Sequence, residues 1–471
     1  MKIEQIYTRC LAQGAYYIMS NGEAAIVDPL RETSAYLQRL EKDGVKLKYI
    51  FETHFHADFV SGHVDLSRAT GAAIVYGPTA QPAFEAIVAE DEQIFTLGDI
   101  TIKVLHTPGH TMESTTFLLI DENRKEHCIF SGDTLFLGDV GRPDLAQKAT
   151  HLTEKELAGL LYESLMKKIM PLNDDVIVYP AHGAGSACGK NMMKETMDTL
   201  GHQKQVNYAL NQPDKASFIE AVVDGLTPPP GYFGMNVAMN KTGYAQFENV
   251  LKKGMRPLNV IELQQAVELE GALLLDTRDN SIFYRGFVPG AVNIGINGDF
   301  APWVGAMIVD VEQPIVLITD DGKEEECITR LSRVGFDNVY GYLQGGFNSW
   351  LTSGTSVDTV DRISAAQFAK EADMAKDMIV DVRRIGEYSA EHIENAWNFP
   401  LEYINNWISQ LPTDTHFYLH CAGGYRSMIA ASILQARGFR NFTEIEGGFN
   451  AIAGTSVPKT DYVCQSKMLQ L

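Results

Sequence analysis

The feature that most restricts the possible folds of this chain is an internal repeat in its second half. The segment LLLDTRDNSIFYRGFVPGAVNIGI, which starts at Leu273, matches MIVDVRRIGEYSAEHIENAWNFPL, which starts at Met378. In each copy an apolar stretch ends in an aspartate two residues before an arginine, and a Gly-Gly-Phe-Asn segment follows near the end of the copy. Each copy covers about 100 residues of alternating strands and helices, which predicts a compact α/β unit that occurs twice.

A longer region of different character precedes the repeat. The Pro/Gly-rich stretch LTPPPGYFGMNVAMNKTGY lies between the two. A chain of 471 residues has room for about two to four domains. We therefore predict a multidomain α/β protein with one large domain over residues 1–250, followed by two small related domains over residues 257–356 and 359–460.

The composition is that of an ordinary globular protein and argues against several partners. The chain is 45% hydrophobic and 21% charged, with a formal net charge of −21. So much negative charge argues against nucleic acid or an anionic membrane as a partner, and an anionic substrate must be captured by a local positive feature. The N-terminus lacks the apolar core of a signal peptide, and six scattered cysteines without a C-x-x-C pair fit a reducing compartment. We expect a cytoplasmic protein.

In the first 250 residues, apolar strands repeatedly lead into loops that carry histidine or aspartate. The segments LKYIFETH, ITIKVLHTPGH, FSGDTLF and DVIVYPAHG all follow this pattern. Side chains two residues apart after a strand project to the same side, so these groups can approach one point at the edge of a sheet. The candidate metal ligands that they deliver are His54, His56, Asp58, His110, Asp133 and His182.

This set of motifs resembles the metallo-β-lactamase superfamily over residues 1–250. The resemblance implies an αββα sandwich with metal bound between its loops. Two-zinc hydrolases of the glyoxalase II type carry H-x-H-x-D-H in the first loop, and the second ion needs the last histidine. Here that position is Phe59, which cannot coordinate a metal. A second ion would keep only Asp58, His182 and a shared Asp133, so we expect one metal ion.

Longer motifs are similar to those of persulfide dioxygenases, which use one iron ion. These motifs are TPGHTMEST, SGDTLFLGDVGRPDL and PPPGYFGMNVAMN. The resemblance assigns one Fe(II) per chain to His54, His110 and Asp133, and two histidines with one carboxylate are the ligand set of non-haem Fe(II) oxygenases. Three further groups would then orient the ligands or the substrate, and the alternative is that they remain zinc ligands. These groups are His56, Asp58 and His182.

Four residues are candidates for the substrate side of this site. Arg142, in the GRPDL loop, either steadies an anionic substrate or ties the loop to an acidic side chain. Tyr232 and Phe233 either line a substrate channel or pack in the core. Cys188, a few residues after the last candidate histidine, either holds sulfur transiently or is an inert buried thiol.

The second copy of the repeat contains a candidate sulfur-binding loop. In FYLHCAGGYRSMIAASILQ an apolar strand stops at His420, a glycine-rich loop begins at Cys421, and a helix follows. Backbone N–H groups and the helix N-terminus can stabilise a thiolate and hold a persulfide or sulfite. Arg426 adds a guanidinium that suits an oxyanion. The Cys-x-x-Gly-x-Arg pattern, with DVR, YSAEHIENAWN and EGGF around it, resembles rhodanese sulfurtransferases. Cys-loop phosphatases share a similar loop but not these surrounding elements. We predict Cys421 and Arg426 as catalytic residues.

The first copy keeps the frame of the repeat without its chemistry. Its equivalent loop, VLITDDGKEEECITRL, places Thr319, or Asp320 one residue later, at the position of the nucleophile, and Glu324 at the position of the arginine. The acidic residues of this loop would repel sulfite or thiosulfate, and Cys327 falls in the following helix, on the wrong side of the loop. We expect an inactive rhodanese-like domain that spaces the two active domains, forms a subunit interface or covers the iron site.

The order of domains resembles the fused persulfide dioxygenase–sulfurtransferases of bacterial sulfide detoxification. This resemblance implies that a low-molecular-weight thiol persulfide is oxidised by O2 to sulfite, and that Cys421 passes a second persulfide sulfur to sulfite to give thiosulfate. The same residues permit the opposite direction, from thiosulfate to persulfide. Two alternatives remain, a zinc-dependent glyoxalase II-like thioester hydrolase with a sulfurtransferase tail, and a persulfide carrier or sensor. We expect a homo-oligomer, either a dimer or a tetramer.

Overall fold

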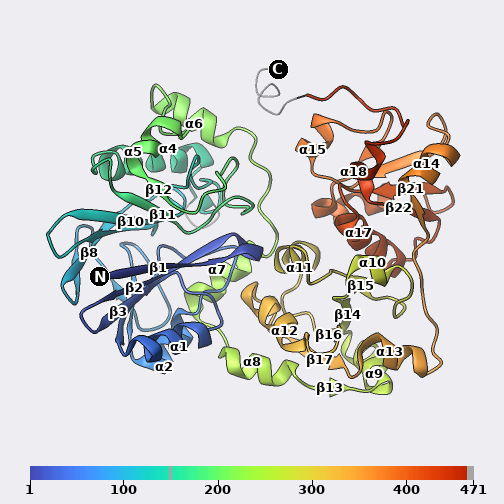
Figure 1. Ribbon diagram of the computed structural model, residues 1–471, viewed down its shortest axis with the longest axis horizontal. Helices are drawn as coiled ribbons and strands as arrows, with labels where there is room; N and C mark the ends of the chain where they lie inside the picture. Colours follow the sequence, from blue (N-terminus) through green and yellow to red (C-terminus); the bar gives the residue numbers. More distant parts are fainter. Residues whose placement is uncertain (148–150, 464–471) are drawn as a thin grey trace. The chain divides into compact units, whose positions relative to one another are not determined.

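The computed structural model describes residues 1–147 and 151–463 of the chain (Figure 1). They form two compact units, one of residues 1–247 together with 332–335, and one that contains the other described residues from 248 onward. None of the helices in the described ranges combines the length and the apolar character that a membrane crossing requires.

The first unit is built on two six-stranded sheets. The first sheet has the order β1-β2-β3-β4-β5-β6; it is antiparallel up to β3 and parallel from there on. The second has the order β12-β11-β10-β9-β8-β7 and is antiparallel except for the pair β10–β11. The strands of the first sheet are β1 (Lys2–Thr8), β2 (Gln13–Ser20), β3 (Glu23–Val27), β4 (Lys46–Phe51), β5 (Ala73–Tyr76) and β6 (Ile87–Val88). The strands of the second are β7 (Ile94–Leu97), β8 (Ile100–His106), β9 (Thr115–Ile120), β10 (Glu126–Gly132), β11 (Ile177–Pro180) and β12 (Asp198–Thr199).

Alternating side chains place one apolar core between the two sheets. Tyr16 and Ile18 of β2 pack in a buried cluster with Phe117 and Phe130 of the second sheet. Tyr17, which lies between them in the sequence, belongs to a different cluster on the opposite face of its strand. This period of two is what a strand with both faces covered requires, and it explains why these strands are apolar on both sides.

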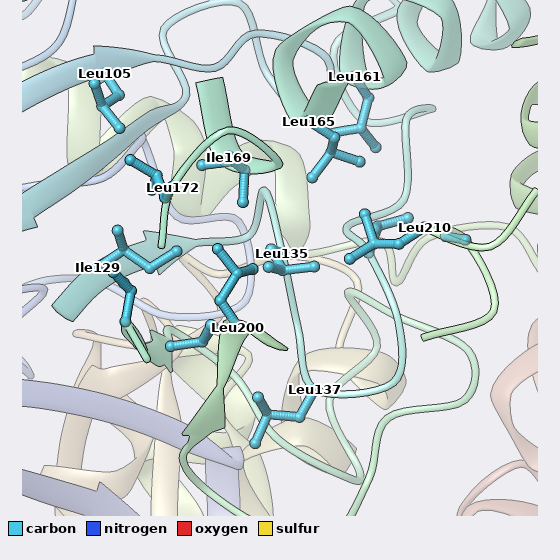
Figure 2. Close-up of a cluster of buried hydrophobic side chains, with 14 of the residues drawn as sticks. Leu105, Ile129, Leu135, Leu137, Leu161, Leu165, Ile169, Leu172, Leu200 and Leu210 are labelled. Atoms are coloured by element: carbon cyan, nitrogen blue, oxygen red, sulfur yellow. The ribbon is translucent and has the colours of Figure 1, made fainter. Parts of the chain in front are cut away.

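Helices cover the outer face of each sheet, which gives the expected αββα sandwich (Figure 1). Figure 2 shows the cluster above the second sheet, where Ile129 of β10 packs with Leu161, Leu165 and Leu200 from the helical layer. The helices over the first sheet are α1 (Ser34–Asp43) and α2 (His63–Thr70). Those over the second are α4 (Glu154–Ser164), with a π-helical turn at Leu165–Ile169, α5 (Leu200–Val206) and α6 (Lys215–Val223). Two further helices, α7 (Phe233–Thr242) and α8 (Phe247–Gly254), lead to the second unit.

The second unit holds two five-stranded parallel sheets of identical topology. Their strand orders are β13-β17-β16-β14-β15 and β18-β22-β21-β19-β20, so the predicted internal repeat is confirmed as a repeat of structure. The strands of the middle repeat are β13 (Pro257–Leu258), β14 (Leu273–Asp276), β15 (Val292–Asn293), β16 (Ile315–Ile318) and β17 (Val339–Leu343). The strands of the last repeat are β18 (Arg362–Ser364), β19 (Met378–Asp381), β20 (Trp397–Asn398), β21 (Phe417–His420) and β22 (Phe442–Glu446).

Each repeat carries five corresponding helices. Those of the middle repeat are α9 (Val260–Glu270), α10 (Asn280–Phe283), α11 (Phe300–Met307), α12 (Glu324–Arg333) and α13 (Gly346–Thr352). Those of the last repeat are α14 (Ala365–Glu371), α15 (Ile385–Ala390), α16 (Ile404–Trp407), α17 (Tyr425–Ala436) and α18 (Gly448–Ile452). The arrangement agrees with the predicted one, an αββα sandwich followed by two small α/β domains.

Candidate functional site

Three of the predicted ligands meet at one point of the first unit. His54 follows β4, His110 follows β8 and Asp133 follows β10, so all three stand at the carboxyl ends of core strands. All three are buried, and their ligand atoms lie within 4.8 Å of one another. Oδ2 of Asp133 is 3.4 Å from Nε2 of His110 and 3.8 Å from Nε2 of His54. Sequence reasoning thus selected residues that the fold does bring together.

In both histidines Nδ1 contacts a neighbouring oxygen atom, which leaves Nε2 as the atom that faces the common point. Nδ1 of His54 lies 3.0 Å from the Thr53 hydroxyl, and Nδ1 of His110 lies 2.8 Å from the carbonyl oxygen of Arg142. A carbonyl can only accept, so Nδ1 of His110 carries the hydrogen and Nε2 presents a lone pair. Nε2 of His110 and Oδ2 of Asp133 are buried and have no hydrogen-bond partner among the residues that the structure describes. Orphaned buried atoms of this kind are costly, and the three residues therefore fit a bound metal ion.

The protonation states at this point also suit a metal. Burial lowers the pKa of His54 well below its usual value, with a further contribution from His56, so the imidazole is neutral. Burial by itself would raise the pKa of Asp133, but the neighbouring His182 and His54 outweigh it and lower this pKa. Neutral imidazoles and an ionised carboxylate are the forms that bind metal.

The other three predicted residues form a second group beside the first. The ligand atoms of His56, Asp58 and His182 also lie within 4.8 Å of one another. His182 sits between two carboxylates, at 2.8 Å from Oδ1 of Asp133 and 2.8 Å from Oδ2 of Asp58. The buried ring of Phe59 packs 4.3 Å from the ring of His56. Nε2 of His56 and Oδ1 of Asp58 are also buried without a hydrogen-bond partner in the described part of the chain. The second group therefore differs from the first in the apolar ring that forms part of its wall.

Two buried acidic residues near His56 were missed by the sequence reasoning. Oδ1 of Asp28 is 3.1 Å from Nε2 of His56, and Asp28 also accepts hydrogen bonds from the backbone and the hydroxyl of Thr53. Oε1 of Glu52 is 2.6 Å from the Ser61 hydroxyl, and burial raises the pKa of Glu52 well above its usual value. Each of these acids directly follows an apolar strand, Asp28 after β3 and Glu52 after β4, and this position was a usable signal for both.

The segment after PPPGY supports the metal loop. Nδ2 of Asn240, in α7, donates to the carbonyl oxygens of His56 and Phe59 at 2.8 Å each. Its Oδ1 accepts from the backbone N–H of Ser61 at 2.8 Å. One buried amide therefore joins α7 to three points of the loop that carries the candidate ligands, and a loop so restrained holds its ligands in place.

The candidates on the substrate side fall into two groups. The guanidinium of Arg142 makes two 2.7 Å bonds to Asp144 and also donates to two backbone carbonyls, so these contacts favour the interpretation that it ties the loop together. Tyr232 is buried, and burial raises its pKa, with Asp58 and Cys188 adding to the effect; it therefore lies on the side of the second group. Phe233 packs edge-on against Tyr232 at 5.1 Å.

Cys188 lies beside two of the candidate metal ligands, Asp133 and His182. Its sulfur is within 4.8 Å of ligand atoms of Asp133 and His182. Burial raises the pKa of the Cys188 thiol, and the charges of Asp58 and Asp133 raise it further. Cys188 is thus a neutral thiol in this arrangement, and a role in holding sulfur stays a prediction.

In the second unit, the loop after β21 forms a cradle for one sulfur atom. The N–H of Gly424 donates to Sγ of Cys421 at 3.1 Å, and the Ser427 hydroxyl lies 3.4 Å from the same atom. Gly424 has a φ of +104°, which favours glycine at this position. Cys421 is 1% exposed and lies at the N-terminus of α17. The Gly424 N–H and the N-terminus of α17 therefore provide the predicted nucleophile with the positive field that a sulfur anion needs.

Arg426 does not close this cradle in the way the sequence suggested. Its two Nη atoms donate to the two carboxylate oxygens of Glu387 at 2.5 and 2.8 Å. Burial would raise the pKa of Glu387, but the pairing with Arg426 outweighs it and lowers this pKa. The guanidinium is thus committed to an acid on α15, and an oxyanion would have to compete with Glu387 for it. The pairing could not be predicted because the partner lies 39 residues away.

The middle repeat has a hydroxyl where the last repeat has its nucleophile. Asp276 pairs with Ile318 in one sheet as Asp381 pairs with His420 in the other, so Thr319 is the equivalent of Cys421. Cys327 lies in α12, the helix after the loop, as expected, and its thiol is buried under the loop, 3.5 Å from the Thr319 hydroxyl. Burial raises the pKa of Cys327, which leaves the middle loop without a reactive thiolate.

Comparisons with known proteins agree with these three parts of the chain. Residues 9–182 match the metallo-beta-lactamase superfamily, and residues 259–353 and 364–455 each match the rhodanese-like domain. A hydroxyacylglutathione hydrolase of Tolumonas auensis is 34% identical over 171 residues, which are 36% of this chain and 60%, less than two thirds, of that relative. Hydroxyacylglutathione hydrolase GloC of Haemophilus influenzae is 28% identical over 234 residues, covering 45% of this chain and 99% of that protein.

A solved structure extends the match beyond the first domain. The crystal structure of a metallo-beta-lactamase from Staphylococcus aureus is 30% identical, with a TM-score of 0.65, and the match covers 73% of this chain and 98% of that one. The identity and the coverage are high enough to establish the family. The chain belongs to the metallo-β-lactamase superfamily, and its metal domain is followed by two rhodanese-like domains.

Proposed function

We propose that this protein is an Fe(II)-dependent persulfide dioxygenase joined to a rhodanese-type sulfurtransferase. Its substrates would be low-molecular-weight thiol persulfides, which it oxidises with O2 to sulfite and converts onward to thiosulfate. One observation carries the proposal for the metal domain. His54, His110 and Asp133 bring three buried ligand atoms within 4.8 Å of one another, while Phe59 takes the place of a ligand in the neighbouring group.

The donor set and the chemistry required support iron as the metal. Bound by His54, His110 and Asp133, Fe(II) would supply open coordination positions and a redox change, which Zn²⁺ lacks. The net reaction takes R–S–SH, O2 and water to R–SH, sulfite and two protons. Thr53 and the Arg142 carbonyl fix the orientation of the histidine rings. Such fixed ligands hold reactants in one geometry, which is the main contribution that a protein makes to this kind of reaction.

The second half of the proposal assigns sulfur transfer to Cys421. Its thiolate attacks the outer sulfur of a second persulfide, the S–S bond breaks, and the thiol leaves with the bonding electron pair and takes a proton. Sulfite then attacks the outer sulfur of the Cys421 persulfide, which releases thiosulfate and restores the thiolate. The Gly424 N–H and the Ser427 hydroxyl lie within reach of the sulfur. In a chain with a net charge of −21, these donors and the N-terminus of α17 provide the local positive field that an anion requires.

The test uses the full chain loaded with ferrous ion under anaerobic conditions. We expect about one iron per chain and O2 uptake that depends on glutathione persulfide. In Cys421→Ser, O2 uptake should stay within about twofold of the wild type, because the iron site is untouched, and the product should shift from thiosulfate to sulfite. Cys327→Ser is the matched control and should leave the product unchanged, since Cys327 is a buried thiol of the middle repeat. Iron-loaded protein that consumes no O2 would refute the dioxygenase, and enzymatic thiosulfate from Cys421→Ser would refute the coupling.

A second candidate function is a zinc-dependent hydrolase of glutathione thioesters. It is supported by the names of the two hydroxyacylglutathione hydrolases and by the second group, whose ligand atoms also lie close together. Zinc would have to bind at His182 in competition with the two carboxylates that already contact it. Elemental analysis and hydrolysis of a hydroxyacylglutathione distinguish the two functions. Two zinc ions per chain with thioester hydrolysis would favour the hydrolase.

A further inference from the structure

The loop that carries Cys421 is anchored outside its own domain. Tyr425, the fifth residue of this loop, directs its side chain into the middle repeat, where its hydroxyl donates to the carbonyl oxygen of Gly295 at 2.7 Å. A Cβ atom on Gly298 would lie 2.4 Å from the ring of Tyr425, so only glycine leaves room for this ring. Tyr425 is thus seated in a socket formed by the segment of the middle repeat between β15 and α11.

A second line of contacts runs from the middle repeat to the same sulfur atom. The guanidinium of Arg362, in β18, lies 4.7 Å from the centre of the Tyr284 ring of the middle repeat. Arg362 donates to Oε2 of Glu444 at 2.7 Å. The Ser427 hydroxyl lies 2.6 Å from Oε1 of Glu444 and 3.4 Å from Sγ of Cys421. A cation stacked on the middle repeat therefore holds the carboxylate to which the Ser427 hydroxyl donates, and this keeps the hydroxyl in place beside the nucleophile.

The helix that follows the loop is attached to the middle repeat as well. The N–H of Asn293, in β15, donates to the Ser432 hydroxyl of α17 at 2.9 Å. Figure 1 shows β15 beside α17, and the contacts between these two elements agree with this view. Both the loop and the helix whose N-terminus faces the sulfur are thus fixed against the neighbouring repeat.

We propose that the middle repeat is a structural part of the Cys421 site. Tyr425 is the positioning residue through which the middle repeat fixes the loop that carries Cys421. Tyr425 is next in the chain to Gly424, whose N–H faces the sulfur. If the ring left its socket, the backbone at Tyr425 and Gly424 could shift, and the Gly424 N–H would no longer be held at Sγ. The inference deepens the proposed sulfurtransferase function, on which it rests, and gives a task to a repeat that has no nucleophile of its own.

The first measurement is the transfer of sulfur from thiosulfate to Cys421 in the full chain, followed by intact-protein mass spectrometry. The Cys421 thiolate attacks the outer sulfur of thiosulfate, the S–S bond breaks, and sulfite leaves with the electron pair. Tyr425→Phe loses one neutral hydrogen bond and should load about threefold to tenfold more slowly. Gly298→Ala displaces the whole ring and should load about tenfold to a hundredfold more slowly. Metal content and circular dichroism show whether each variant is folded.

Two matched control variants show whether slower loading comes from the change in the Tyr425 socket or from a general loss of packing. Tyr388→Phe removes a tyrosine hydroxyl that donates to the Ala396 carbonyl inside the last repeat. Gly454→Ala adds a methyl group where the nearest atom is 3.6 Å away. Both should load at the wild-type rate. If Tyr425→Phe and Gly298→Ala also load at the wild-type rate, the inference is wrong.

A double variant tests whether Gly298 acts through Tyr425. If it does, Tyr425→Ala with Gly298→Ala should load no more slowly than Tyr425→Ala alone, because the ring that the new methyl group would displace is gone. Additive losses would show that the two residues act independently and would overturn the inference.

A second readout does not depend on sulfurtransferase activity. Alkylation of Cys421 by iodoacetamide, followed over pH by peptide mass spectrometry, reports how well the loop stabilises the thiolate. Tyr425→Phe and Gly298→Ala should move the pH of half-maximal rate upward, and an unchanged profile would overturn the inference. If the wild type takes no sulfur from thiosulfate, the sulfurtransferase proposal fails, while this profile still decides the role of Tyr425.

The charged and titratable groups around Cys421 that these variants leave in place are Arg426, Glu387, Arg362, Glu444 and His420.

Discussion

Glu444 offers a quantitative test of the packing beneath the Cys421 loop. Its carboxylate is buried in β22, where it accepts hydrogen bonds from Ser427 and Arg362. Burial raises the pKa of Glu444 to about 7, although Arg362 and Ser427 oppose this rise. We predict that Glu444→Gln removes a pH dependence from the stability of the last repeat.

The size and sign of this effect follow from linkage. Because its pKa is higher in the folded state than its ordinary value of 4.5, Glu444 binds its proton more tightly in the folded protein. The stabilisation is fully present below pH 4.5 and is lost as the pH rises through 7. The rise of about 2.5 pH units, at about 1.36 kcal/mol each, is worth about 3.4 kcal/mol, of which about 2.5 kcal/mol is lost between about pH 5 and 8.5.

Hydrogen exchange measures this loss where it occurs. Protection factors of peptides from β21 and β22, taken at pH 5 and at pH 8.5, give the free energy of local opening in the wild type and in Glu444→Gln. The wild type should lose about 2.5 kcal/mol relative to the glutamine variant over this interval. Glu446→Gln changes an exposed glutamate two residues along the same strand and keeps Glu444. This control should therefore lose about as much opening free energy between the two pH values as the wild type does. A difference between wild type and Glu444→Gln that is equal at both pH values would refute the reasoning.

Three further predictions concern the metal centre and Arg426. Phe59→His should raise the metal content from about one to about two ions per chain, since its ring packs on His56 of the second group; elemental analysis that still finds one ion would contradict this. Asp133→Ala removes the carboxylate that both ligand histidines face, and should lower metal affinity by at least about a hundredfold without altering the circular dichroism; retained metal would count against the assigned site. Glu387→Gln frees Arg426 from its ionic partner, and should lower the KM for thiosulfate by about threefold in initial-rate assays, whereas an unchanged KM would argue that Arg426 has no part in anion binding.

The fold was predictable because its signals are local. Apolar strands ending in histidine or aspartate gave the scaffold of the first unit, and the matching Gly-Gly-Phe-Asn segments gave the repeat, which returns as two sheets of identical strand order. The ligands His54, His110 and Asp133 were found for the same reason. Each lies within four residues of the carboxyl end of a strand, β4, β8 or β10, so the motif of an apolar strand followed by a polar side chain was visible in the sequence.

The contacts that tune the sites were not predictable, because they join residues that are distant in the sequence. Arg426 meets Glu387 across 39 residues, and Tyr425 meets Gly295 across 130. A single chain gives no local sign of such pairs, and a charged side chain on a loop is compatible with many partners. Arg142 shows the opposite limit, because its acid lies only two residues away, yet the geometry was needed to choose between tying the loop and holding a substrate.

The two repeats differ by an exchange of sulfur and oxygen at one contact. In the last repeat the loop carries the sulfur of Cys421 and the helix beneath it carries the hydroxyl of Ser427, 3.4 Å away. In the middle repeat the loop carries the hydroxyl of Thr319 and the helix carries the sulfur of Cys327, 3.5 Å away. Both arrangements fill the same space, so the fold tolerates either one. Only the first places a thiol where backbone N–H groups and a helix N-terminus can stabilise its anion. A hydroxyl in that place stays protonated at neutral pH, and a buried thiol under the loop has no route to substrate. The middle repeat can therefore lack a reactive thiolate and still pack as its neighbour does. A repeat that keeps its packing can act as a rigid support for the last repeat.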